Sequence, residues 1–207
     1  MSPVFKYILI GFTSIVGLLM IYFLYIFISI ASVFGGIFER DYSIDELKTE
    51  YNHKEKEIDD LIKYFNQIKP KDKSVAIEFK NDKILERLVI VPSDTTKNTY
   101  RGWDINVKNL YQQEFKKELH WDEDQVDELK NRLDEANCIS IEDGEPVKIG
   151  FKRYGMGMYF FNVFQKEETD RTLFNDGCTY ILVNDKMALE YGGGAIGRQC
   201  FSKQNLK

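Results

Sequence analysis

The glycine-rich segment near the C-terminus is the first candidate for cofactor chemistry. Residues 192–197 read Gly-Gly-Gly-Ala-Ile-Gly and match the spacing G-x-G-x-x-G. A dinucleotide-binding loop with that spacing lies between a strand and a helix, and an acid follows about 20 residues later. Residues 198–207 contain no acid, and Gly-Lys-Ser/Thr does not occur in the chain. We therefore interpret the segment as a glycine turn or bulge and expect no cofactor.

The two histidines, His53 and His120, do not define a metal site. Glu50 and Glu57 lie at helical spacing from His53, but the lysines between them compete for the same carboxylates. His120 precedes Trp121 at an expected helix break, where packing is the ordinary role. No C-x-x-C and no G-x-S-x-G occurs. We expect neither a bound metal nor a nucleophile motif.

Two kinds of site remain open. A hydrolase using Asp104, Asp176 or Glu190 is one alternative, because catalytic carboxylates need to meet only in the fold. A recognition surface is the other, since Tyr and Arg are frequent at binding hot spots. Its candidates cluster around the glycine-rich turns, although they are also ordinary sheet residues: Arg153, Tyr154, Tyr159, Tyr191 and Arg198.

The chain has 3 cysteines, Cys138, Cys178 and Cys200. In an oxidising compartment one pair and one free thiol are expected. Cys178 and Cys200 flank the last expected hairpin, so we favour that pair. Three free thiols in a cytosolic domain is the competing interpretation.

The elements that position these residues predict an α+β domain. Ser43 and Glu46 form a capping box that begins a helix, and Pro70 ends it; the all-polar stretch 52–57 is interpreted as a joint between a stalk helix and a domain helix. Strand patterns follow at 75–79, 88–91 and 100–107, then a helical region at 109–136 that breaks at 121–122. Further strands at 138–141, 147–154, 158–165, 179–183, 187–191 and 195–201 predict an antiparallel β-meander covered by two or three helices.

The N-terminal segment predicts a membrane anchor. Residues 7–38 carry no charge, and a spanning helix at about 8–34 exceeds the roughly 20 residues that a bilayer requires. A cleaved signal peptide stays open, because Ser29-Ile30-Ala31 resembles a cleavage site, although the apolar run is long for one. Representative lipid-facing residues are Ile8, Phe12, Leu18, Phe23, Ile28 and Val33.

The distribution of charge suggests which side of the membrane the domain occupies. Lys6 is the only charged residue before Glu39, which favours an N-terminus inside and a domain outside the cytoplasmic membrane, in the periplasm or at the cell exterior. The whole chain carries −5. Such acidity argues against a nucleic-acid partner, which needs a basic surface. The small residues of the anchor are common in spanning helices and define no oligomer.

Together these features predict three segments: an anchor (1–38), a stalk with the first amphipathic helix (39–70) and a globular part (71–207), the last two forming one folded unit. The leading hypothesis is a single-pass membrane protein, not an enzyme, whose acidic domain binds another protein, as an immunity-type protein or an accessory subunit of an envelope complex does. The alternatives are the hydrolase above and a structural protein that works through its spanning helix.

Overall fold

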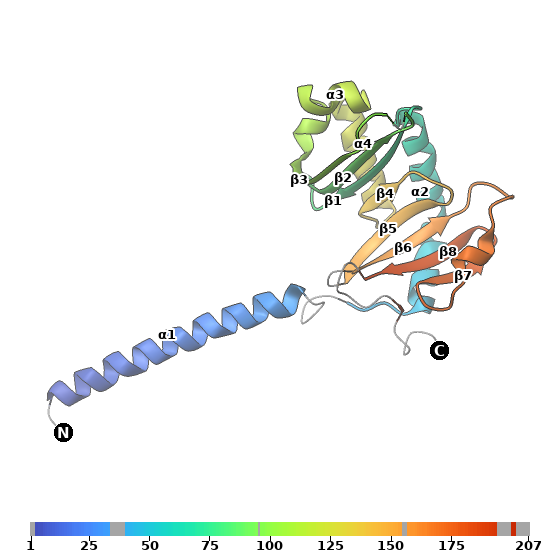
Figure 1. Ribbon diagram of the computed structural model, residues 1–207. Coiled ribbons are helices and arrows are strands. Elements are labelled where there is room, and N and C mark those ends of the chain that lie inside the picture. The colour runs from blue at the N-terminus through green and yellow to red at the C-terminus, as the bar shows by residue number, and fades with distance from the viewer. Residues whose placement is uncertain (1–2, 34–39, 95, 155–156, 194–199, 202–207) are drawn as a thin grey trace.

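The computed structural model describes residues 3–33, 40–94, 96–154, 157–193 and 200–201. Its first element is helix α1 (Pro3–Val33), which Figure 1 shows as a single rod away from the sheet. Within it, residues Gly11–Ile30 are long and apolar enough to cross a membrane, and none of that window is buried. Phe12, Leu18 and Phe23 are exposed. The same length and composition also fit a signal sequence.

Helix α2 (Ile44–Ile68) begins at the expected capping box, in which Ser43 Oγ accepts a hydrogen bond from the Glu46 N–H at 3.2 Å. The predicted joint at 52–57 is wrong, because the helix runs through that stretch without a break. Lys and Glu have high helix propensity, so a polar segment need not interrupt a helix. Lys54 Nζ also ties the stretch to helix α4 (Glu123–Glu135) by donating to the Glu135 carbonyl at 2.7 Å.

Within the described residues, eight antiparallel strands form one sheet in the order β3-β2-β1-β4-β5-β6-β8-β7, which confirms the α+β class and the antiparallel sheet. The strands are β1 (Lys73–Phe79), β2 (Ile84–Pro92), β3 (Tyr100–Asn106), β4 (Ser140–Glu142), β5 (Val147–Tyr154), β6 (Gly157–Val163), β7 (Tyr180–Asn184) and β8 (Met187–Gly192).

The last part of the sheet departs from a simple meander. After β6 the chain passes to the edge as β7 and returns as β8, which lies between β6 and β7. The connection from β6 to β7 is long and contains the 3₁₀-helix η2 (Arg171–Phe174), so it can reach past one strand position. The strand expected at 195–201 falls mostly outside the described residues.

The helices cover one face of the sheet. Helix α4 (Glu123–Glu135) lies beside α2 behind the sheet in Figure 1, and the expected break before it is confirmed by the capping residue Asp122. The 3₁₀-helix η1 (Val107–Leu110) and helix α3 (Gln113–Leu119) complete this layer. The core between the layers includes Phe65, Ile77 and Phe161. On the opposite face, the described residues include a helix only at the β7–β8 end, where Phe174 of η2 packs against Tyr180. We call this face the open face.

Candidate functional site

Side chains of the open face form a row that crosses the sheet. Glu78 on β1 lies opposite Ser140 on β4, which lies opposite Gly150 on β5. The row continues through Phe160 on β6 to Glu190 on β8. Because side chains alternate between the two faces of a strand, the neighbours of these residues point into the core instead. The open face is therefore set by the register of five strands.

The row passes through a hollow of about 370 Å³ on the open face. Three acidic and three basic side chains line it, so its formal charge is zero. We call it the open-face hollow, and its lining consists of Glu78, Arg87, Trp103, Glu142, Lys148, Arg153, Met158, Phe160, Glu190 and Gly192.

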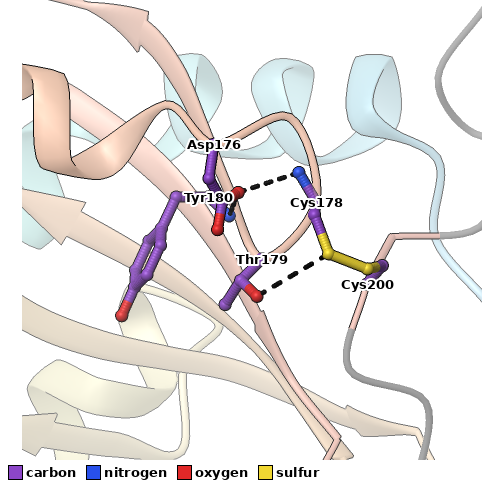
Figure 2. Close-up of a disulfide and its surroundings, with 5 residues drawn as sticks. All are labelled: Asp176, Cys178, Thr179, Tyr180 and Cys200. Atoms are coloured by element: carbon purple, nitrogen blue, oxygen red, sulfur yellow. Dashed lines mark hydrogen bonds between the residues drawn. A yellow bond between two sulfur atoms is a disulfide. The ribbon is translucent and has the colours of Figure 1, made fainter.

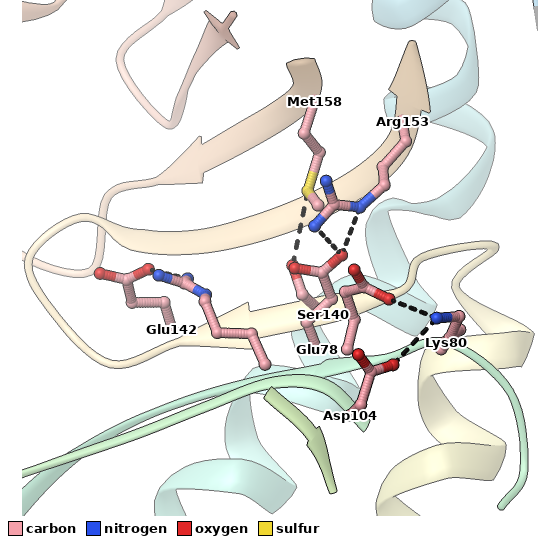
Figure 3. Close-up of polar contacts among 9 residues, drawn as sticks. Glu78, Lys80, Asp104, Ser140, Glu142, Arg153 and Met158 are labelled. Carbon is pink, nitrogen blue, oxygen red and sulfur yellow. Dashed lines mark hydrogen bonds and ion pairs between the residues drawn. The ribbon is translucent and has the colours of Figure 1, made fainter. Parts of the chain in front are cut away.

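Glu78 is a buried carboxylate held by one arginine. Its side chain is only 4% exposed, and Glu78 Oε1 accepts a hydrogen bond from Arg153 Nε at 2.7 Å and forms an ion pair with Arg153 Nη2 at 2.6 Å. Figure 3 shows the guanidinium of Arg153 above this carboxylate. Burial raises the pKa of Glu78, and the charge of Arg153 opposes that rise. The pair thus has a buried acidic member and a basic member that solvent reaches.

Glu190 repeats this arrangement on β8. Its side chain is 8% exposed, and Glu190 Oε1 accepts from Lys148 Nζ at 2.6 Å. The amide of the buried Asn162 donates to Glu190 Oε2 at 3.0 Å. Lys148 Nζ also lies 4.1 Å from the ring centroid of Phe160, which is cation–π distance. Its position is therefore fixed from two sides.

The third pair lies nearer the solvent. Arg87 Nη2 on β2 donates to Glu142 Oε2 at 3.1 Å, and both side chains are partly exposed. Trp103 lies opposite Arg87 on the edge strand β3 and is 63% exposed. A large aromatic side chain left in water beside ordered charges is a frequent feature of binding hot spots.

Gly150 allows the side chains of Ser140 and Met158 to approach each other at the centre of the row. A Cβ at this position would lie 2.0 Å from Ser140 Oγ and 2.6 Å from Met158 Sδ. Ser140 Oγ donates to Met158 Sδ at 3.8 Å, and Figure 3 marks this contact with a dashed line. Any larger residue would force these two side chains aside. The glycine is therefore required for this close approach rather than for a turn.

The carboxylates expected for a hydrolase do not converge. Asp104 belongs to the edge strand β3 and pairs with Lys80 Nζ at 2.9 Å, whereas Asp176 precedes β7 at the opposite edge. Glu78 and Glu190 share one row, but three strands separate them. At roughly 4.8 Å for each step between strands, four steps place these two carboxylates about 19 Å apart. Paired glycosidase carboxylates are at most about 9.5 Å apart.

The predicted tyrosine–arginine surface needs correction. Tyr159 and Tyr191 are buried, so neither offers a contact to a partner. The Tyr159 hydroxyl donates to Asp41, and its ring packs against Phe201, which places Tyr159 in an aromatic part of the core. Tyr154 is partly buried against the core. Only Arg153 lines the open-face hollow, and Arg198 lies outside the described residues.

The structure joins Cys178 and Cys200 in a disulfide, the pair that the hairpin position favours (Figure 2). Asp176 Oδ1 stabilises the adjoining turn by accepting the N–H groups of Cys178 and Tyr180, each at 2.8 Å. Cys138 is a free, buried thiol, and burial raises its pKa to about 12. A thiol protonated at neutral pH is a poor nucleophile, so Cys138 is structural.

Apart from Arg153 and Glu190, the residues that line the open-face hollow were not identified by sequence reasoning. A signal was present for Glu78, which is the single charge in the otherwise apolar predicted strand 75–79. A charge at that place points away from the core and needs a partner on the same face. Which charged residues form ion pairs depends on the order of the strands in the sheet. No local sequence pattern encodes that order.

Comparisons with protein-family models, curated proteins and solved structures gave no match.

Proposed function

We propose that this chain is a single-pass membrane protein whose domain lies outside the cytoplasmic membrane and binds another protein through the open-face hollow. The observation that carries the proposal is a hollow on the open face, away from η2, that is lined by paired charges and bordered by the exposed Trp103. An extended, shallow site of this kind suits a protein surface better than a small substrate, which usually needs a deep and mostly apolar pocket. An immunity-type or envelope-accessory role fits this architecture.

The anchor supports the membrane location. The 20-residue window from Gly11 to Ile30 is predominantly apolar and none of it is buried, which water disfavours and lipid accepts. The disulfide between Cys178 and Cys200 supports the outward side, because such bonds persist in oxidising compartments. The single basic residue before the apolar window Gly11–Ile30, Lys6, agrees with this orientation.

Partner capture tests the binding role. We would extract the full-length tagged chain in a mild detergent and compare it with a variant carrying Trp103→Ala and Arg87→Ala. We expect one protein to be recovered with the unchanged chain and lost with this variant. Lys117→Gln, an exposed residue on α3, is the control and should leave recovery intact. Recovery that is absent, or equal for both variants, contradicts the proposal.

Thiol labelling tests the side of the membrane. In a Cys138→Ala background, Lys117→Cys provides one accessible thiol, since the other two cysteines are bonded to each other. A reagent that cannot cross the membrane should label this variant in intact cells. Labelling only after the cells are lysed would place the domain inside.

A further inference from the structure

The charged groups of the open-face hollow are arranged in two levels. Glu78 and Glu190 form the floor, with side chains 4% and 8% exposed. Above them lie the basic groups of Lys148, Arg87 and Arg153, which are between 27% and 36% exposed. A molecule that approaches this face therefore meets the cations before it meets those two acids.

The floor also orients the cations. Arg153 contacts Glu78 Oε1 through one hydrogen bond from Nε and one ion pair from Nη2, and Lys148 is held by Glu190 and the ring of Phe160. A guanidinium has five N–H donors, so donors of Arg153 and Arg87 remain beyond the bonds described here. Such groups bind carboxylates with little loss of side-chain entropy, because they are already fixed in place.

Charges beside the hollow do not reverse this pattern. Arg101, on the same strand and face as Trp103, is exposed and adds a fourth cation. Glu86 and Asp104 lie nearby, but both are paired with Lys80, at 3.4 and 2.9 Å. The acidic residues of the helices are on the other side of the sheet, and salt screens charges beyond about 8 Å at physiological ionic strength.

From this arrangement we infer that the partner presents acidic side chains, from Asp or Glu, to the open-face hollow. A basic partner would find only Glu142 within reach, because Arg153 and Lys148 cover the other two carboxylates. A nucleic acid would need a continuous run of basic groups along its phosphates, whereas the hollow offers three cations beside three carboxylates. The inference rests on the proposed function and adds the chemistry of the partner.

Trp103 gives a direct readout of this contact. The chain has 2 tryptophans; Trp121 is 1% exposed in the core, whereas Trp103 borders the hollow. We would titrate the full-length chain, in a neutral detergent and at about 50 mM salt, with a decaglutamate peptide. We expect a saturable change in tryptophan fluorescence that Trp103→Phe abolishes, and an affinity that falls at least fivefold at about 300 mM salt.

Matched variants separate a specific contact from general attraction. Arg87→Gln should weaken decaglutamate binding about fivefold, and its partner Glu142 tolerates the change because it is partly exposed. Lys117→Gln removes an equal charge from the helix layer and should change nothing. Lys148→Gln supplies a second test, since Glu190 keeps its bond from Asn162.

Several results would overturn the inference: no saturable change with decaglutamate, equal or tighter binding of decalysine or of a thymidine decanucleotide, or equal weakening by Arg87→Gln and Lys117→Gln. A protein partner that is captured through Trp103 while decaglutamate fails to bind leaves the proposed function standing and removes the inference. If decaglutamate binds but no protein is captured, the acidic preference of the hollow stands and the proposed function is contradicted.

Discussion

The Glu78–Arg153 pair should respond very unequally to the loss of its two members. Arg153→Gln leaves a buried carboxylate without its counter-charge, and breaking a buried ion pair in this way costs about 3–5 kcal/mol. The Arg153 side chain is 36% exposed, so water already screens the pair, and we expect about 2–3 kcal/mol at neutral pH. For a domain of this size that lowers Tm by roughly 5–10 °C.

The reverse substitution should cost much less. In Glu78→Gln the amide oxygen still accepts a hydrogen bond, and the remaining cation, Arg153, is partly hydrated. We expect a loss below about 1 kcal/mol. Urea unfolding of the full-length chain in detergent, followed by the fluorescence of the buried Trp121, measures both variants.

The destabilisation caused by Arg153→Gln should depend on pH. Burial already raises the pKa of Glu78 above its ordinary 4.5, and removing Arg153 raises it further. The folded state then binds the proton more tightly than the unfolded state does. The loss of stability in Arg153→Gln is therefore complete above the pKa of Glu78 in the folded state, and it fades as the pH falls towards 4.5. Equal costs for the two variants at neutral pH, or a cost of Arg153→Gln that does not shrink in acid, would refute this account.

Three further changes test other parts of the structure. Replacing Cys178 and Cys200 by Ser opens a loop with a sequence separation of 22 and should lower the unfolding free energy by about 3 kcal/mol, an effect that dithiothreitol should reproduce in the unchanged chain. Gly150→Ala should cost about 1–3 kcal/mol in urea unfolding, because its Cβ would lie 2.0 Å from Ser140 Oγ; if Ser140→Ala does not recover part of that loss, the close approach is not its cause. Ser43→Ala removes the cap of α2 and should cost about 1 kcal/mol, whereas Ser43→Asp should restore most of it; an unchanged Tm for Ser43→Ala would exclude the capping box as a stabilising element.

Local signals predicted most of the elements of this fold. The Ser43 cap and Pro70 bound helix α2 at both ends, and the alternating residues of 147–154 give the limits of β5. The stretch 52–57 misled because its contacts come from distant residues, such as the Glu135 carbonyl that accepts from Lys54. Strand order also depends on contacts between distant residues. The position of β8 between β6 and β7 therefore did not follow from the lengths of the turns.

The open-face hollow was harder to predict for the same reason. Tyrosines near glycine turns suggested an exposed surface, but Tyr159 and Tyr191 belong to the core face of their strands. A shift of one residue in register moves every side chain of a strand to the other face of the sheet. Tertiary packing therefore decides which residues of a strand face the core. Glu78 and Arg153 are 75 positions apart and meet only because β4 lies between β1 and β5.

Site-specific photo-crosslinking in intact cells tests the central claim most directly. A photoreactive phenylalanine analogue would replace Trp103 on the open face or, as the control, Lys117 on the helix layer. The account predicts an adduct with another protein at position 103 and none at position 117. No adduct at position 103, or the same adduct at both positions, would contradict a binding role for the open-face hollow.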